Sequence, residues 1–144
     1  METSEFAAFV RDHGLGVIAT LGPQGTPQAA VVAVVATDLG EVVFGTERGS
    51  RKFANIGQRP AVALAIGWDE DEITVQCEGL ADEPSGADMD RCLKYYLDRF
   101  PREQRLVQNG ELGLVRVRMN WIRYDDPRPE SPRRFEETFP AITS

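Results

Sequence analysis

One short segment of this 144-residue chain gathers the residue types that bind phosphate groups: Thr46, Ser50, Arg51 and Lys52. Ser50 precedes a predicted helix, so its hydroxyl is placed to cap that helix. The first amides of a helix lack intrahelical acceptors and lie at the positive end of its dipole, which favours an anion there. Arg51 adds a planar fork of donors, Lys52 a point charge and Thr46 a further hydroxyl. The segment predicts a site for one phosphate group, although the same pattern also occurs on solvated surface helices.

The charge of the whole chain restricts the partners that this cationic segment can serve. Asp and Glu number 23 against 16 Lys and Arg, giving a net charge of -7 and a pI near 4.8. Such a chain repels nucleic-acid backbones and anionic lipid surfaces, so we expect neither nucleic acid nor a membrane as partner. No apolar run is long enough to span a bilayer. Because the first residues are acidic and not basic like those of a secretion signal, we expect a cytoplasmic protein.

The remaining chemical groups indicate no metal centre. Cys77 and Cys92 do not have the spacing of metal ligands and are expected to be buried, reduced thiols. His13 is the one histidine of this sequence, and it falls in the last turn of a predicted helix, where its charge suits the dipole. The acidic run 69–72 lacks the alternating ligands and central glycine of a calcium loop, which favours a solvated hairpin over a cation site.

The elements that must position the segment are predicted to be strands joined by short turns. Apolar runs bounded by Gly, Pro and Asp predict six strands, at residues 15–21, 26–36, 41–46, 61–68, 73–81 and 112–124. Helical spacing predicts helices at residues 4–13, 50–56 and 82–100. The first turns are too short for crossover helices, so we expect an antiparallel sheet closed into a small barrel. The fold class is therefore mainly β (α+β), with flanking helices.

The last predicted strand and the tail complete this single domain, 1–144. Strict alternation along residues 112–124 places Trp121 on one face with Val115, Val117 and Met119, and puts Arg116, Arg118 and Asn120 on the other. The proline-rich tail, about residues 126–144, is predicted to be extended. Its two phenylalanines, Phe135 and Phe139, are expected to pack on the barrel or on a partner subunit.

The ordered series of motifs resembles the pyridoxamine 5'-phosphate oxidase-like proteins of the FMN-binding split-barrel superfamily. The resemblance covers about residues 6–125, and its central part is Gly49-Ser50-Arg51-Lys52 following Val43-Phe44-Gly45-Thr46. Further agreement lies in residues 16–20, 25–28, 55–56, 59–64, 75–81 and 118–124.

This resemblance implies a six-stranded antiparallel split β-barrel that forms a homodimer, with FMN held at the subunit interface. Ser50, Arg51 and Lys52 would then grip the FMN phosphate, while Thr46, with Gly45 beside it, would contact the phosphate or ribityl chain. The flavin ring would lie along a strand segment and be completed by one polar and one aromatic residue: Ala30, Val31, Val32, Ala33, Thr74 and Trp121.

The activity implied is that of an FMN-dependent oxidoreductase, with hydride transfer through flavin N5 to or from a small molecule. An F420-dependent reductase, or a flavin-binding carrier or electron-transfer protein without turnover, are the alternatives. True pyridoxamine-phosphate oxidases carry basic residues where this chain has Ala30 and Val35, and no histidine follows His13. Oxidation of vitamin B6 is therefore not expected, and haem binding is disfavoured because a convincing axial histidine is missing.

Overall fold

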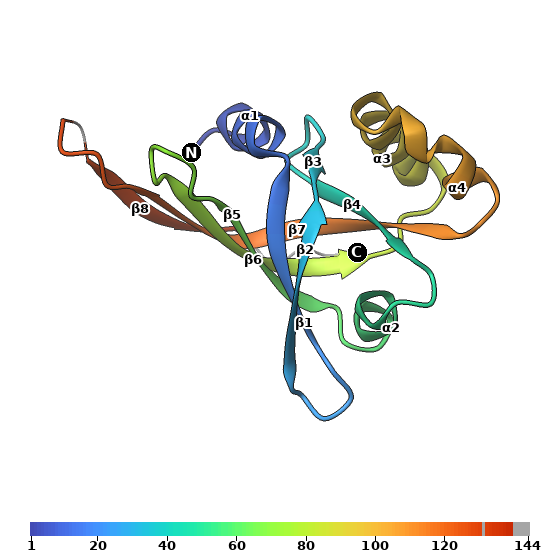
Figure 1. The fold of residues 1–144 in the computed structure, drawn as a ribbon. Coiled ribbons are helices and arrows are strands. Elements are labelled where there is room, and N and C mark those ends of the chain that lie inside the picture. The colour runs from blue at the N-terminus through green and yellow to red at the C-terminus, as the bar shows by residue number, and fades with distance from the viewer. Residues whose placement is uncertain (131, 140–144) are drawn as a thin grey trace.

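The protein is described here by a computed structural model of residues 1–130 and 132–139 (Figure 1). Within these residues eight strands form one sheet, in which every pairing is antiparallel. The order along the sheet is β2-β1-β5-β6-β7-β4-β3, and β8 pairs with β7 beside this path. The strands are β1 (Leu15–Leu21), β2 (Pro27–Ala33), β3 (Val35–Ala36), β4 (Val42–Glu47), β5 (Ala61–Gly67), β6 (Thr74–Asp82), β7 (Leu112–Asp126) and β8 (Arg133–Thr138).

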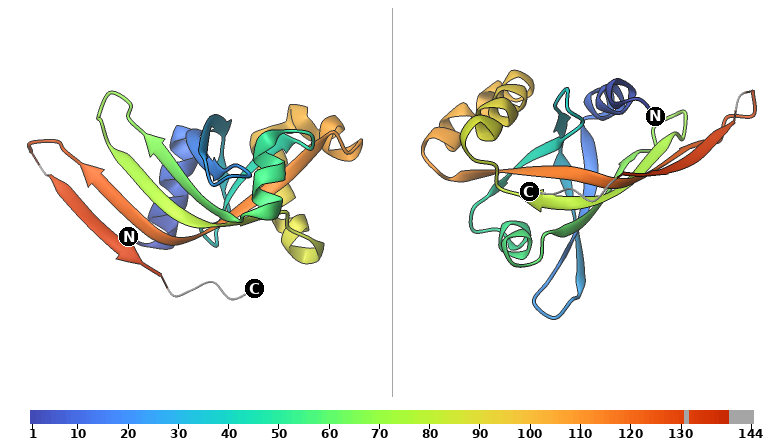
Figure 2. Two further views of the ribbon diagram at one scale, coloured as in Figure 1. Left: turned by 90° about the horizontal axis from the view of Figure 1, so that it is seen from below. Right: turned by 180° about the vertical axis from the view of Figure 1, so that it is seen from behind.

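The sheet curls into a half-barrel because consecutive strands lie at the two ends of its strand order. Only Val34 separates β2 from β3, yet β2 pairs with β1 whereas β3 pairs with β4. The chain therefore crosses from one end of the sheet to the other, which brings those ends together. Figure 2 shows the resulting curvature. The antiparallel split barrel with flanking helices is thus confirmed.

The helices stand on two sides of the curled sheet (Figure 1). The helix α2 lies beside the β1–β2 hairpin, apart from α1 and α3, which lie along the opposite side. Their bounds are α1 (Thr3–His13), α2 (Arg51–Gln58), α3 (Gly86–Arg99), the 3-10 turn η1 (Pro101–Glu103) and α4 (Gln104–Gln108). Among the described residues, no helix is both long and apolar enough to cross a membrane.

Two hydrophobic clusters hold these layers together. The larger lies inside the curl, where α1 contributes Phe6 and Val10 and the strands contribute residues such as Ile18 and Phe44. The smaller cluster lies between β4, β7 and α3 and contains the buried Tyr96. On the face of the sheet that points away from the curl, α3 covers only β4 and β7. The neighbouring part of that face, formed by β2, β1 and β5, therefore keeps exposed apolar side chains.

The structure differs from the predicted elements in two places, within the second predicted strand and in the tail. The predicted strand 26–36 is divided at Val34, because its two parts pair with different neighbours. The tail contains a strand, β8, that pairs with β7 over Asp126 to Trp121. Phe135 stacks on Tyr124 with ring centroids 5.3 Å apart, and Phe139 packs against the larger core cluster. Both phenylalanines therefore pack on the barrel.

The predicted alternation along the last strand is wrong after Met119. Gly79 of β6 lies opposite Met119, but its neighbour Glu78 lies opposite Trp121, so Asn120 is an extra residue in β7. Such a bulge reverses which face the following side chains occupy. Trp121 therefore shares a face with Arg118 and not with Met119.

Candidate functional site

The start of α2 has the capped geometry that its sequence predicts. The Ser50 Oγ accepts a hydrogen bond from the backbone N–H of Phe53 at 3.3 Å. The same hydroxyl lies 2.8 Å from the hydroxyl of Thr46, at the end of β4. Because the cap uses only the Phe53 amide, the N–H groups of Arg51 and Lys52 in the first turn remain available to an external acceptor. The strand end and the helix start thus present two hydroxyls and two amides together.

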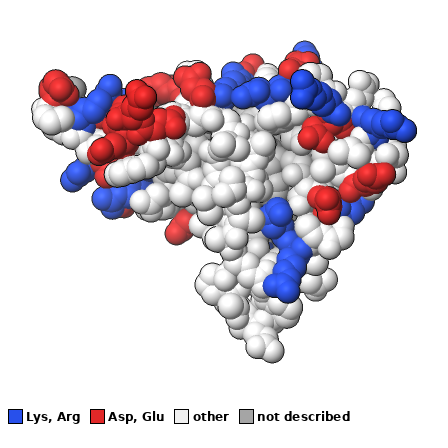
Figure 3. Space-filling model, in the orientation of Figure 1, with Lys and Arg blue, Asp and Glu red and all other residues white. Residues whose placement is uncertain are grey.

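The two cations of this turn, Arg51 and Lys52, have no charged partner in the described part of the chain. Arg51 is exposed and Lys52 is half-buried, and within the described residues neither forms an ion pair. The neighbouring Arg48 differs, since its guanidinium pairs with Glu83 at 2.9 Å. Figure 3 shows basic side chains between α2 and the β1–β2 hairpin, whose residues 15–33 carry no charged side chain. This is a local positive site in an acidic chain.

A cleft of about 230 Å³ connects these cations with the hairpin. Its walls are Arg51 and Lys52 of α2 together with four residues of β1 and β2: Thr20, Gln28, Ala29 and Ala30. Ala30 is therefore brought to the same place as the two cations. The small side chains of β2 leave room for a ligand to lie against the strand.

A residue that the sequence analysis did not select, Asn55, fixes the orientation of α2. Its buried amide nitrogen donates to the hydroxyl of Thr20 at 2.9 Å and to the side-chain oxygen of Gln28 at 3.0 Å. These bonds tie the helix to the wall of the cleft formed by β1 and β2. A polar residue on the buried side of an otherwise amphipathic helix was the signal available in the sequence, because buried amides need partners.

The other candidate residues of β2 and β4 divide between the two faces of the sheet. Val32 is part of the core, while Val31 and Ala33 point outward and are exposed. Gly45 lies against the Tyr96 side chain of α3, where a Cβ atom would collide with the phenol. The close packing of α3 against β4 therefore explains why residue 45 is glycine.

Two candidate residues lie away from the α2 cleft within one chain. Thr74 begins β6 and pairs with Gly67, whereas the part of β6 that borders α2 is its other end, at Ala81 and Asp82. Trp121 is half-buried in the middle of β7, on the same face as Glu78. A single subunit does not bring Thr74 or Trp121 to the cations.

The two cysteines and the histidine of the chain have structural surroundings: the cysteines are buried and the histidine is hydrogen bonded. Burial raises the pKa of Cys77 to about 12 and that of Cys92 to about 11, so both thiols are protonated at neutral pH. Both ring nitrogens of His13 are engaged, Nδ1 with the Phe9 carbonyl oxygen at 2.8 Å and Nε2 with Asp69 at 3.1 Å. No group of three metal-ligating side chains occurs in the part of the chain that the structure describes. The two hydroxyls, two free amides and two cations at the start of α2 are the kinds of groups that suit the binding of an anion.

Comparison with known proteins assigns the chain to a family. The family model described as pyridoxamine 5'-phosphate oxidase matches residues 2–124. A pyridoxine/pyridoxamine 5'-phosphate oxidase of Burkholderia multivorans is 32% identical over 135 residues, which are 88% of this chain but only 62% of that protein. The chain thus spans less than two thirds of the length of that relative.

Solved structures show the same fold. A haem-binding protein from Mycobacterium smegmatis superposes with a TM-score of 0.80 at 19% identity, covering 96% of this chain and 58% of that one. A pyridoxamine 5'-phosphate oxidase-related, FMN-binding protein from Nostoc punctiforme gives 0.65 at 12% identity and covers 95% and 94% of the two chains. At these identities the similarity concerns architecture.

Proposed function

Because this chain belongs to the pyridoxamine 5'-phosphate oxidase family, we propose that it binds FMN and acts as a flavin-dependent oxidoreductase on a small molecule. The observation that carries the proposal is the start of α2, where Arg51 and Lys52 have no ion-pair partner among the described residues and line a cleft against β2. A relative of the same fold from Nostoc punctiforme is described as FMN-binding.

The donor set at α2 fits a terminal phosphate monoester. Such a group carries a charge of roughly -1.5 to -2 and offers strong acceptor oxygens. Arg51 and Lys52 would neutralise that charge, and their backbone N–H groups and the Thr46–Ser50 hydroxyl pair would donate to the oxygens. Asn55 ties the helix to β1 through Thr20 and to β2 through Gln28.

The strand β2 is suited to hold the flat ring of the flavin. It lies at one end of the strand order and, within the described residues, pairs only with β1. Along the unpaired side of β2, every second residue therefore has a backbone N–H and C=O that are free to hydrogen bond with the polar atoms of a flavin ring. Ala29 and Ala30 add little bulk beside this edge, so a ring could approach closely. When bound, FMN supplies hydride transfer at N5, and the residues of this chain bind and orient it.

We also propose that the protein acts as a homodimer through the face formed by β2, β1 and β5, which we call the outer face. Large apolar side chains are exposed there: Val31 by 71%, Leu15 by 58% and Val17 by 41%. The register places Val31 beside Val17 and Val17 beside Ala65, in one continuous apolar row. A patch of this kind is typical of a protein interface. A partner could then supply residues such as Trp121 and Thr74, which one subunit does not bring to the cleft.

Alternative cofactors use different chemistry. F420 also carries a phosphate group, but as an internal diester with one negative charge, so the donor set at α2 favours the terminal monoester of FMN. Haem would need an axial ligand, and both nitrogens of His13 are already hydrogen bonded, which disfavours haem even though the Mycobacterium smegmatis relative binds it. Ala30 and the buried Val35 occupy the places of basic residues of true pyridoxamine-phosphate oxidases, so we propose a different substrate. A flavin carrier without turnover is the remaining alternative.

The visible spectrum of the purified protein tests the proposal. We expect flavin absorbance, either as purified or after addition of FMN and dialysis, and FMN as the mass of the extracted ligand. Parallel titrations with FMN and F420 distinguish these two cofactors. A preparation that stays colourless with both would overturn the proposal. Bound flavin that no reduced nicotinamide or other donor bleaches would support the carrier instead.

A further inference from the structure

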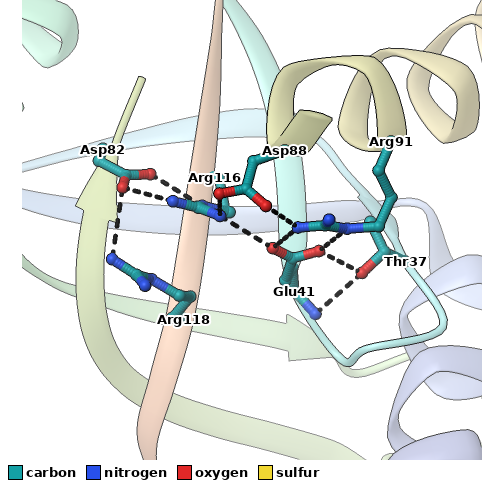
Figure 4. A network of polar contacts seen from close by, with 7 residues as sticks. All are labelled: Thr37, Glu41, Asp82, Asp88, Arg91, Arg116 and Arg118. Carbon is teal, nitrogen blue, oxygen red and sulfur yellow. Dashed lines mark hydrogen bonds and ion pairs between the residues drawn. The ribbon is translucent and has the colours of Figure 1, made fainter. Parts of the chain in front are cut away.

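A network of ion pairs that joins α3 to the sheet is built on arginines (Figure 4). The buried carboxylate of Glu41 accepts hydrogen bonds from Arg91 at 2.9 and 2.8 Å and from Arg116 at 3.2 Å. The other two carboxylates of the network, those of Asp82 and Asp88, also pair with arginines. Because a guanidinium group stays protonated throughout the neutral range of pH, these contacts do not depend on pH there.

The ion pair between His13 and Asp69 is of a different kind, because histidine changes its charge between about pH 5 and pH 8. His13 is the last residue of α1, and Asp69 lies in residues 68–73, which connect β5 to β6 and which we call the β5–β6 turn. The imidazole Nε2 lies 3.1 Å from the Oδ2 of Asp69, and the His13 side chain is only 13% exposed. This contact ties the β5–β6 turn to the end of α1.

Both ring nitrogens of His13 face oxygen atoms that only accept hydrogen bonds. Nδ1 lies 2.8 Å from the backbone carbonyl oxygen of Phe9, and Nε2 faces the carboxylate of Asp69. A neutral imidazole carries one N–H, so it would leave the lone pair of its other nitrogen facing an oxygen, whereas an imidazolium donates to both. The end of a helix also favours a positive charge. The observed geometry therefore fits the protonated form of His13.

The groups that other elements place near the end of α1 keep their charge around neutral pH. Arg99 of α3 has its Nη2 3.2 Å from the position that a Cβ atom of Gly14 would take, and arginine stays protonated. Tyr124 of β7 contacts Phe9 edge-on at 6.3 Å between ring centroids, and burial raises the pKa of Tyr124 above its usual value of 10. The strands β3 and β5 carry no titratable side chain. The further charged residues of α1 and of the β5–β6 turn near this contact are arginine, aspartate and glutamate: Arg11, Asp12, Glu70, Asp71 and Glu72. Carboxylates ordinarily titrate near pH 4, so His13 is the member of this group that changes charge around neutral pH.

The β5–β6 turn has a backbone conformation that is unfavourable by itself. Trp68 and Glu72 have φ values of 69° and 60°, in the left-handed region that bulky side chains rarely adopt. Two backbone hydrogen bonds close the turn, from Trp68 N–H to the Ile73 oxygen at 2.9 Å and from Glu72 N–H to the Asp69 oxygen at 3.0 Å. The Trp68 side chain is 67% exposed, so its packing contributes little to holding the turn. The ion pair with His13 therefore matters for the closed form.

We propose that His13 is a pH-sensitive latch: its imidazolium holds the β5–β6 turn closed against the end of α1, and loss of the proton above neutral pH releases the turn. In the neutral ring one N–H stays with one acceptor, and the ion pair with Asp69 is lost. Relief of the unfavourable backbone at Trp68 and Glu72 then favours an open turn. The latch uses no residue of the α2 cleft, so it does not depend on the binding of FMN.

Amide hydrogen exchange of the full chain, measured by NMR at pH 5.5 and pH 8.5, tests the latch. The results are compared as protection factors, which remove the pH dependence of the exchange chemistry itself. The N–H of Glu72 reports the closed turn, because it bonds to the Asp69 carbonyl oxygen. We expect its protection factor to be at least about threefold higher at pH 5.5, as a partly exposed ion pair allows.

The β1–β2 hairpin provides an internal control in the same sample. The N–H of Gly22 bonds to the Thr26 oxygen at 2.8 Å, and residues 15–33 carry no charged side chain. Its protection factor should change by less than about 1.5-fold between the two pH values, because no local group titrates there.

Three variants locate the effect. His13→Gln is neutral at both pH values and should lose the pH dependence of Glu72 protection. Asp69→Ala keeps the backbone acceptor of Glu72 but removes the carboxylate, so protection at pH 5.5 should fall to the level of the wild type at pH 8.5. Glu70→Gln is the matched control, because Glu70 is an exposed acid of the same turn that forms no ion pair within the described residues; it should keep the pH dependence of the wild type.

The latch is contradicted if Glu72 of the wild type is equally protected at both pH values, or if Gly22 changes as much as Glu72. A pH dependence that persists in His13→Gln, or protection at pH 5.5 that Asp69→Ala leaves unchanged, would equally overturn it.

Discussion

At the scale of single residues, the start of α2 shows how much of the site follows from local sequence. Ser50 was predicted to cap the helix and does so through the Phe53 amide, because capping depends only on residues close in the chain. The role of Asn55 could not be predicted in this way. Its partners Thr20 and Gln28 are 35 and 27 residues away, and only the pairing of β1 with β2 brings them together.

The buried carboxylate of Glu41 is predicted to make the stability of the protein depend on pH. Burial opposes its charge, but hydrogen bonds from Arg91 and Thr37 outweigh burial and hold the pKa of Glu41 below its usual value of 4.5. The unfolded chain therefore takes up a proton at higher pH than the folded protein does. The stability that Glu41 contributes is complete above about pH 4.5 and is lost as the pH falls through the folded pKa.

Urea unfolding of Glu41→Gln between pH 7 and pH 3 measures this contribution. We expect the variant to be less stable by about 3 kcal/mol at pH 7, because Arg91 and Arg116 lose a buried partner, and to lose less stability than the wild type below pH 4.5. Glu136→Gln, which breaks an exposed pair with Arg123, should change the free energy of unfolding by less than about 1 kcal/mol. Equal pH dependence in Glu41→Gln and wild type would contradict this account.

At the scale of elements, the sequence predicted most strands but not where they bend or break. The sequence located β1 with both its ends, since Gly14 ends the preceding helix and Gly22-Pro23 begins a turn. It did not show the division between β2 and β3, because both parts are rich in valine and alanine and differ only in their pairing partners. The β7 bulge was also missed, since one extra residue leaves an alternating pattern that looks regular on either side.

Gly79 lies opposite the β7 bulge, and its replacement is predicted to destabilise the sheet. A Cβ atom at this position would overlap the backbone carbonyl of Arg118, which has no freedom to move aside. We expect Gly79→Ala to lower the free energy of unfolding by more than about 2 kcal/mol. Gly57→Ala is the control, since Gly57 lies in α2 with open space around it and alanine should stabilise the helix by about 0.5–1 kcal/mol. Thermal unfolding of both variants gives the comparison, and equal stabilities would contradict the bulge geometry.

At the scale of the whole molecule, the curl of the sheet gives the two faces of the β1–β2 hairpin different environments. The inner face meets α2 and forms the cleft with the cations, and the outer face is apolar and exposed. The family resemblance implied a dimer, but the sequence pattern did not reveal which side of the barrel would form it. In the structure α3 covers only the β4–β7 half of the outer side of the sheet, which leaves the part formed by β2, β1 and β5 uncovered.

Val31→Asp tests the proposed interface. A carboxylate in the middle of the outer face should weaken self-association at least tenfold, because a charge would be buried without a partner. Leu39→Asp is the matched control, since Leu39 is similarly exposed, at 65% against 71% for Val31, but lies in the β3–β4 turn. Sedimentation velocity over a range of concentrations measures the effect. A wild-type protein that is monomeric, or equal behaviour of the two variants, would contradict the proposed dimer.

The measurement that tests the central claim most directly is the affinity for FMN compared with that for riboflavin, which lacks the phosphate. Quenching of flavin fluorescence should show that FMN binds at least about 100-fold more tightly, since several charge-assisted hydrogen bonds reach the phosphate. The double variant Arg51→Gln, Lys52→Gln should lose this difference while binding riboflavin as the wild type does. Equal affinities for the two flavins in the wild type, or an unchanged preference in the double variant, would contradict the assignment of the α2 start as a phosphate site.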